Sequence, residues 1–182
     1  MDARAIEPIF QRKSRPLTHT PHRGLLEPML LTSLITRDAV LPSLKANGKK
    51  QALQELSDRA GFVSNLAPRE IFDALLQRER LGSTGLGEGI AIPHAKLARA
   101  TSIFGLFARL VRPIDFESID GAPVDLVFLL VGPESAGADH LKALARIARL
   151  LRDKALISKL RAARDSAALY AILTEEQTSR AA

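Results

Sequence analysis

The sequence predicts an α/β fold: one domain in which helices cover apolar strands from both sides. The apolar run from Val124 to Val131 has the near-continuous hydrophobicity of a strand that is buried on both faces. Segments with helical spacing of apolar residues stand before and after such runs, and this order is typical of strands packed between helices. The length of 182 residues suits a single domain with a substantial core.

Residues 1–26 are expected to form a flexible N-terminal tail, and residues 27–178 the folded domain. The tail contains three prolines and scattered charges without clear periodicity, a composition that does not build a core. His19 and His22 lie there with a spacing that metal ligands can have, but a proline-rich tail is a poor place for a metal site. We assign them no role and expect no bound metal.

The domain is expected to begin with a short helix or turn, an edge strand and a longer helix. The helix or turn is predicted over residues 29–35, and the edge strand over residues 39–41. The longer helix is predicted from Gly48 to Ala60, because apolar residues mark one face of that segment. Gly61 follows it directly and is expected to stop the helix.

A second helix is expected to begin at Pro68, because the missing N–H of proline has no helical partner in the first turn in any case. It should run to about Arg80. Arg78 and Arg80 then fall in its last turn, near the negative end of the helix dipole. The apolar stripe of this helix consists of Ile71, Phe72, Leu75 and Leu76.

Two strands are expected in the middle of the domain. The first should run from Ser102 to Leu110 and end where Arg112-Pro113 breaks it. Asp120-Gly121 is a turn signal. The second strand, Val124 to Val131, is expected to lie at the centre of the sheet, since it is apolar on both faces.

Three helices are expected to close the domain. Asp139 is a suitable N-cap for the first, and the other two are predicted over residues 154–161 and 166–173. The inward stripe of the first helix is expected to consist of Leu141, Leu144, Ala148 and Leu151.

Composition excludes several classes of protein. The chain has no cysteine, which rules out disulfides, thiolate chemistry and zinc–cysteine sites. No apolar run approaches the about 18 residues that span a bilayer, and the first residues lack the apolar core of a signal peptide. We therefore expect a cytoplasmic protein without membrane insertion.

The net charge of +6 is concentrated between Lys142 and Arg164, where eight Lys and Arg residues face one acid, Asp153. Such a stretch is usually a solvated helix face, and we favour this interpretation. A nucleic-acid-binding surface is the alternative, but the stretch contains no aromatic side chain to stack on bases.

The stretch from Gly82 to His94, GSTGLGEGIAIPH, carries the clearest functional signal. Its four glycines allow tight turns and a close approach of the backbone to a bound group. Ile90 to Ile92 suits a short buried strand that Pro93 ends, so His94 is expected at a strand end. The spacing fits neither the dinucleotide fingerprint, which opens a helix, nor a Walker loop, which needs Gly-Lys-Ser/Thr.

Three side chains that carry or can take a positive charge lie at ends of expected elements. Arg78 ends the helix before the loop, His94 follows the strand, and His140 lies at a helix N-terminus. A neutral imidazole can attack a phosphoryl group, while a guanidinium, a second imidazole and loop N–H groups stabilise the charge on its oxygens. The loop adds three candidate phosphate-binding residues: Ser83, Thr84 and Gly85.

Each of these residues also has a simpler interpretation that the sequence leaves open. A single histidine is more often a surface or capping residue than a catalyst, and His140 in a first helical turn can point into water. Arg78 can be an exposed cation that stabilises the helix C-terminus. Glu88, the only acid of the loop, is interpreted as solvating the turn.

On these residues the chain resembles the IIA domain of the mannitol/fructose type from the bacterial phosphoenolpyruvate-dependent phosphotransferase system. The resemblance covers residues 26–174 and is greatest to the stand-alone members of the nitrogen branch. Ala95 stands where the family often has glycine. The segments that carry the resemblance are Arg78–His94, Pro113–Phe116, Ile119–Leu130 and His140–Leu141.

The resemblance implies a mixed β-sheet flanked by helices, and a phosphocarrier without cofactor rather than a free-standing enzyme. It implies that Nε2 of His94 is phosphorylated, that His140 helps to bind the phosphoryl group, and that Arg78 is the arginine of the motif. The phosphoryl donor would be HPr or its nitrogen-branch analogue. Regulatory target proteins, in potassium transport or nitrogen regulation, would respond to the phosphorylation state.

Three functions compete at this point. The first is a phosphohistidine relay and regulator of the nitrogen branch, and the second is the IIA component of a fructose or mannitol uptake system, which serves a sugar IIB. Both use the same chemistry at His94 and differ in their partners. The third is a basic nucleic-acid-binding module, and salt-dependent binding that is independent of His94 would favour it.

Overall fold

The computed structural model describes residues 31–179, with side chains to residue 175, so the tail expected over residues 1–26 lies outside the described part. The helical segments are η1 (Leu31–Ser33), η2 (Arg37–Ala39), α1 (Lys49–Ser64), α2 (Pro68–Arg80), α3 (Gly137–Leu150), α4 (Lys154–Ala162) and α5 (Ser166–Ser179). The strands are β1 (Val40–Leu44), β2 (Gly85–Gly87), β3 (Ile90–Ala91), β4 (His94–Leu97), β5 (Phe104–Ile114) and β6 (Val124–Pro133).

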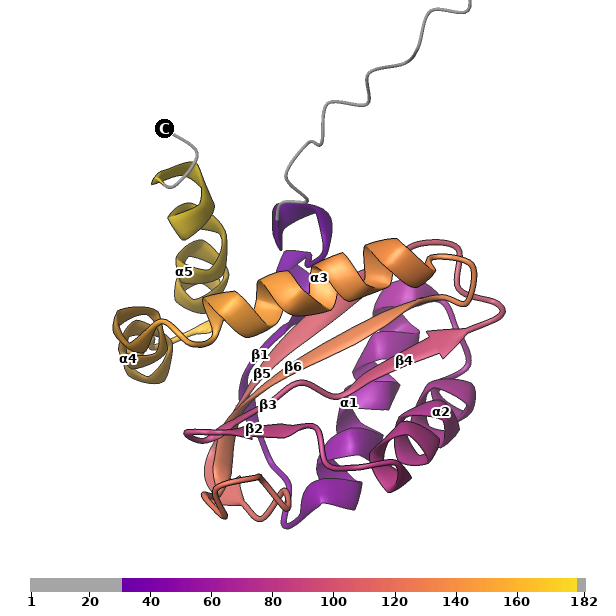
Figure 1. The fold of residues 1–182 in the computed structure, drawn as a ribbon. Coiled ribbons are helices and arrows are strands. Elements are labelled where there is room, and N and C mark those ends of the chain that lie inside the picture. The colour runs from indigo at the N-terminus through magenta and orange to yellow at the C-terminus, as the bar shows by residue number, and fades with distance from the viewer. Residues whose placement is uncertain (1–30, 180–182) are drawn as a thin grey trace, which may run out of the picture.

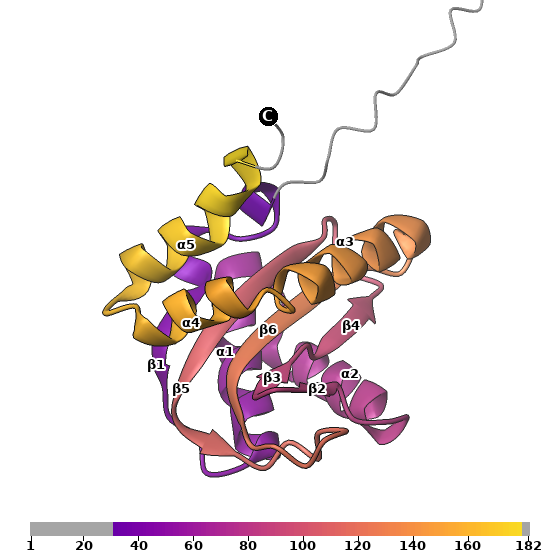
Figure 2. The ribbon, with the colours of Figure 1, turned by 60° about the vertical axis from the view of Figure 1, so that its left-hand side comes forward.

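The six strands form one mixed sheet in the order β1-β5-β6-β3-β2, and β4 pairs with β6 beyond β3. The pairs β5–β6 and β2–β3 are antiparallel, while β1–β5, β3–β6 and β4–β6 are parallel. Helices α1 and α2 lie on one face of this sheet, and α3 crosses the other face (Figure 1). Figure 2 shows α4 and α5 following α3 toward the side of β1. The predicted α/β fold is confirmed.

Strand β6 forms the centre of the core, as the sequence predicts. Every side chain from Leu126 to Val131 is fully buried, because helices cover both faces of the strand. The rings of Phe107 and Phe128 pack edge-to-face on the β5–β6 pair, with their centroids 6.5 Å apart. Burial on both faces explains why this segment has no alternation of apolar and polar residues.

The edge strand expected over residues 39–41 is β1, which begins at Val40 and continues to Leu44. It contains Pro42, whose missing N–H is tolerated because β1 pairs only with β5 in the sheet. The carbonyl of Pro42 accepts a hydrogen bond of 3.1 Å from Nε of Arg109.

Gly61 does not stop α1, contrary to the sequence-based expectation. The helix continues to Ser64, and Asn65 ends it in the left-handed conformation with φ of 58°. Gly61 has a packing role instead: a Cβ atom there would lie 2.6 Å from Cγ of Pro68 and 2.9 Å from the carbonyl of Leu66. The glycine therefore lets α2 start close against α1.

Arg112-Pro113 does not end β5 either, since the strand runs from Phe104 to Ile114. The pairing with β6 shifts between Arg109 and Ile114, where β5 has more residues than its partner. Pro113 falls in this irregular stretch, so the ladder loses no regular hydrogen bond at the proline. A β-bulge is a place where a strand accepts proline.

Helix α3 begins two residues before Asp139, and its N-cap is Ala136. Asp139 lies in the first turn and pairs with Lys142 at 3.1 Å instead of capping the helix. Leu141, expected to point inward, is 63% exposed, whereas Leu144 and Ala148 pack against the core and Leu151 is buried, as expected. The buried face of α3 is rotated relative to the expected one, because it includes the side chain of His140. The buried residues within this helix are His140, Ala143, Ile147 and Leu150.

Within residues 31–179, none of the helices combines the length and the apolar character that crossing a bilayer requires.

The packing of Gly61 generates a test of the fold. We expect Gly61→Ala to lower the free energy of unfolding by about 1–3 kcal/mol, because the added methyl group forces α1 and α2 apart. Gly137→Ala is the matched control, since nothing lies within 4 Å of a Cβ there and alanine favours the helix. Urea unfolding of both variants measures the difference, and equal stability of the two would contradict the packing role.

Candidate functional site

The glycine-rich loop folds into a hairpin, and His94 begins a strand. Strands β2 and β3 pair across a turn at Glu88, where Gly87 and Gly89 have φ of 97° and 81°. The expected strand ends at Ala91, but His94 opens β4, which pairs with the same edge of β6. His94 thus follows the end of a short strand, as expected, and it also begins a second strand that the sequence did not predict. The reason is the length of β6, which accommodates two short strands in succession.

The imidazole of His94 is held by two hydrogen bonds that define its protonation. Nδ1 lies 2.9 Å from the carbonyl oxygen of Ile92, so it carries the hydrogen and donates. Nε2 accepts a hydrogen bond of 3.0 Å from Nε of Arg78. Arg78 also donates from Nη1 to the carbonyl of Gly82 at 3.0 Å. The ring is therefore neutral, with the lone pair of Nε2 directed toward the guanidinium.

The environment keeps His94 neutral. Burial lowers the pKa of His94, and the positive charges of Arg78 and Lys96 lower it further. The hydrogen bond to Ile92 and the charge of Glu79 oppose this shift without reversing it. A neutral nitrogen lone pair is consequently present at physiological pH, as nucleophilic attack requires.

His140 is buried beside His94 and does not point into water, so the simpler interpretation of this residue is wrong. Its side chain is 2% exposed, and the two ring centroids are 6.2 Å apart. The ring lies over Gly132 of β6, where a Cβ atom would be 2.8 Å from Nδ1 of His140. Among the described residues neither ring nitrogen has a hydrogen-bond partner. Burial, then the neighbouring His94 and Lys96, lowers the pKa of His140 to about 4.

These residues surround a hollow of about 380 Å³ between α2 and α3, with β4 as its floor. Figure 1 shows β4 between these two helices. Arg78 and Lys96 are its cations, and its described lining includes no Asp or Glu. The remaining walls are Ala74, Gln77, Leu81, Ala95, Leu141 and Leu144, together with the two histidines. A positively charged, partly apolar hollow suits an anionic group brought by a macromolecule.

Lys96 is absent from the residues singled out by sequence, yet it lines this hollow. One residue separates Lys96 from His94 along β4, so both side chains lie on the same side of the strand. The spacing of two residues between His94 and Lys96 would have indicated this role of Lys96. That inference requires knowing that His94 begins a strand.

The three loop residues expected to bind phosphate use their donors inside the protein. Thr84 donates from both its backbone N–H and its hydroxyl to the buried carboxylate of Glu79, at 3.0 and 2.7 Å. The Ser83 hydroxyl donates to the carbonyl of Phe116, and the N–H of Gly85 donates to that hydroxyl. A phosphate-binding role stays a prediction, and it requires these donors to change partners.

Glu79 was not recognised from sequence either. It follows Arg78 in α2, accepts the donors of Thr84 and lies 3.4 Å from Nζ of Lys49. The carboxylate thereby fixes the glycine-rich loop to the end of the helix that carries Arg78. No local pattern marks this role, because a glutamate near a helix end usually faces solvent.

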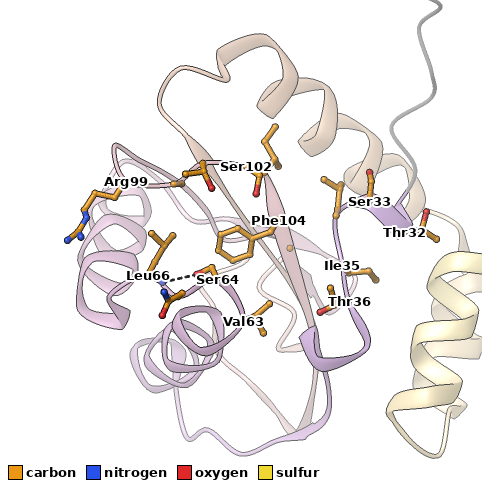
Figure 3. A pocket seen from close by; sticks show the side chains of 16 residues that line it. Thr32, Ser33, Ile35, Thr36, Val63, Ser64, Leu66, Arg99, Ser102 and Phe104 are labelled. Atoms are coloured by element: carbon orange, nitrogen blue, oxygen red, sulfur yellow. Dashed lines mark hydrogen bonds between the residues drawn. The ribbon is translucent and has the colours of Figure 1, made fainter.

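A larger hollow, of about 540 Å³, lies elsewhere and lacks such chemistry. Segment 32–36, the end of α1 and the loop before β5 line it, mainly with Thr, Ser and apolar side chains (Figure 3). Its cation, Arg99, points outward and lies 3.4 Å from Glu70. None of its lining residues is a histidine or a carboxylate. Chemistry rather than size therefore identifies the smaller hollow as the candidate site.

The basic stretch from Lys142 to Arg164 is partly neutralised within the fold. Arg161 binds Asp125 through two hydrogen bonds of 2.7 and 2.8 Å, and it also donates to the carbonyl of Glu88. This contact ties α4 to the β2–β3 turn. In the described part of the chain, no cluster of three or more potential metal ligands is present.

Comparison with known proteins shows the family to which the chain belongs. The family described as phosphoenolpyruvate-dependent sugar phosphotransferase system, EIIA 2, matches residues 33–176. A nitrogen regulatory protein of Bradyrhizobium diazoefficiens is 62% identical over 145 residues, which cover 80% of this chain and 95% of that protein. The crystal structure of nitrogen regulatory protein IIA-Ntr from Neisseria meningitidis has a TM-score of 0.73 at 34% identity, over 76% of this chain and 95% of its own. Mannitol IIA from Escherichia coli shares the fold, with a TM-score of 0.66 at 20% identity over 76% and 98% of the two chains.

The burial of His140 generates a prediction about acid. In the unfolded chain its pKa is about 6.5, so as the pH falls through this value the unfolded state binds the proton first. The folded state therefore loses stability until the pH reaches about 4, the pKa of folded His140. Between about pH 7 and pH 5, wild type should lose about 2 kcal/mol more of its free energy of unfolding than His140→Gln. Urea unfolding at both pH values measures this, and equal losses in the two proteins would refute it.

Proposed function

The chain belongs to the EIIA type-2 family of the phosphoenolpyruvate-dependent sugar phosphotransferase system, and on that premise we propose that Nε2 of His94 accepts a phosphoryl group. The observation that carries the proposal is the pair of hydrogen bonds on its ring. With the Nδ1 hydrogen donated to Ile92, Nε2 keeps its lone pair, which accepts from Arg78 at the wall of the positively charged hollow. The domain of residues 27–178 would act as a phosphocarrier in the cytoplasm.

The proposed transfer is an in-line displacement between two histidines. The lone pair of Nε2 attacks the phosphorus of a phosphohistidine on the carrier, and the P–N bond to the carrier breaks. The electrons of that bond return to the carrier nitrogen, whose ring becomes neutral. The ring of His94 gains the phosphoryl group and a positive charge, and it keeps the Nδ1 hydrogen. The carbonyl of Ile92 stabilises that charge through the existing hydrogen bond.

Arg78 and His140 are positioned to stabilise the phosphoryl oxygens. For Nε2 of His94 to attack, Arg78 must first release its lone pair, and the freed Nε–H of the guanidinium can then donate to the phosphoryl oxygens. Neither ring nitrogen of the buried His140 has a hydrogen-bond partner among the described residues, so the ring can donate to a phosphoryl oxygen without breaking an existing hydrogen bond. Ser83, Thr84 and Gly85 remain candidate contacts from the loop.

The rim of the hollow suits a protein as phosphoryl donor. Leu81 and Leu141 are 83% and 63% exposed, and they lie on opposite sides of the hollow at α2 and α3. Exposed large apolar side chains beside a polar centre are typical of protein interaction sites. We infer that HPr or its nitrogen-branch analogue docks on this rim.

The names of the similar proteins favour regulation over sugar uptake. A nitrogen regulatory protein is 62% identical to this chain, whereas a fructose-specific EIIABC component of Bacillus subtilis is 34% identical and mannitol IIA 20% identical. We propose a regulator of the nitrogen branch, whose contacts with target proteins, in potassium transport or nitrogen regulation, change with phosphorylation. A phosphoryl group adds about −1.5 to −2 charges to this docking face. Service to a sugar IIB is the alternative.

The decisive variant is His94→Gln, which removes the acceptor nitrogen and keeps the size of the side chain. Incubated with phosphoenolpyruvate, enzyme I and HPr or the nitrogen-branch equivalents, wild type should gain one acid-labile phosphoryl group. The variant should gain none while its thermal unfolding stays cooperative. Intact mass spectrometry measures the gain, and labelling of the variant would overturn the assignment. Comparing the two donor systems distinguishes nitrogen-branch from sugar-branch membership.

Arg78→Gln tests the stabilising cation. We expect transfer at least about tenfold slower, because one charged donor to the phosphoryl oxygens is lost. The pKa of His94 should also rise, since the positive charge of Arg78 lowers it. Arg80→Gln is the matched control at the same helix end, with an exposed side chain outside the hollow. Stopped-flow transfer and an NMR titration of His94 measure both effects, and wild-type values would exclude the role.

A further inference from the structure

We propose that Lys96 is the second cation of the phosphoryl site and that its ammonium group binds the oxygens of the phosphoryl group on His94. The inference rests on the proposed phosphorylation of His94 and extends it to a residue that carries no assigned role. It follows from the register of β4, from the charges around the hollow and from the freedom of the lysine side chain.

The register of the sheet places Lys96 beside both histidines. His94 and Lys96 are two residues apart on β4, where they pair with Leu130 and Gly132 of β6. The ring of His140 lies over Gly132, which is directly opposite Lys96. Lys96 thus extends from the same side of the strand as His94, next to the position over which the ring of His140 lies. All three side chains line the same hollow.

A phosphoryl group in the hollow needs a second positive charge near its oxygens, and Lys96 can supply it. A phosphoryl group carries up to two negative charges on its oxygens. The positive charge of the phosphorylated His94 ring is directed through Nδ1 at the carbonyl of Ile92, so the proposed transfer gives those oxygens one cationic donor, Arg78. His140 supplies a donor without a charge at neutral pH, because burial keeps its ring neutral in the free site. Among the lining residues Lys96 is the other cation, and the described lining holds no carboxylate that would compete for it.

Lys96 is available for this contact. Its side chain is exposed, and within the described residues it forms no salt bridge or side-chain hydrogen bond. Its positive charge already reaches both histidines, since it contributes to the lowered pKa of each. A flexible four-carbon stem and three donors let an ammonium group follow the phosphoryl oxygens, whereas the guanidinium of Arg78 is anchored at Gly82.

The test compares phosphorylated wild type, Lys96→Gln, Lys96→Arg and the control Lys142→Gln by ³¹P NMR titration. Lys142 is an exposed cation of α3 that pairs with Asp139 outside the hollow. Loss of the neighbouring positive charge should raise the second pKa of the phosphoryl group by about one unit in Lys96→Gln. Lys96→Arg and Lys142→Gln should keep the wild-type value. A merely structural role would not produce this pattern.

Each outcome decides the proposal. A raised phosphoryl pKa in Lys96→Gln, restored in Lys96→Arg, supports it. An unchanged titration overturns it, and slower transfer with an unchanged titration would mean that Lys96 acts in docking the carrier. If wild type takes up no phosphoryl group from either donor system, the proposed function fails and the role of Lys96 fails with it. Uptake by wild type with an unchanged titration in Lys96→Gln removes only the role of Lys96.

Discussion

The pairing of β4 with β6 is the constraint on which the candidate site depends. It places His94 at the beginning of a strand, opposite Leu130, and brings Lys96 opposite Gly132. Because Gly132 has no side chain, the ring of His140 packs directly on β6 and reaches the neighbourhood of His94. The same strand forms the centre of the hydrophobic core. Stability and site geometry therefore share one element, and a shift of its register would disturb both.

Burial and charge act together on the two histidines. Both rings lose solvation, and both face Lys96, so the pKa of each is lowered. A buried imidazole without hydrogen-bond partners is costly to the folded state. Within residues 31–179 His140 has no such partner, and the cost is explained if a phosphoryl oxygen becomes its partner. The site is thus arranged for an anion: neutral nitrogens provide the lone pair and the donor, and the cations lie around them.

The loop that supplied the strongest sequence signal is held from several sides. Glu79 and Lys49 fix its start to α1 and α2, and Arg161 fixes its turn to α4. Its glycines allow the backbone to form a tight hairpin. The hydroxyls of Ser83 and Thr84 donate hydrogen bonds to Phe116 and Glu79. In the free protein this loop therefore positions His94 and Arg78 through its contacts with neighbouring segments.

The sequence by itself determined the elements with strong local signals: the apolar run of β6, the proline that starts α2, and the segment from Arg78 to His94. It also selected His94, His140 and Arg78, and the structure brings these three together. Where local signals were misread, at Gly61, at Pro113 and in the stripe of α3, contacts with distant segments overrode them. Only the tertiary structure decided that His140 is buried and that Lys96 and Glu79 belong to the site. The reason is physical: burial, strand register and charge proximity depend on which segments pack together, and spacing along the chain does not contain that information.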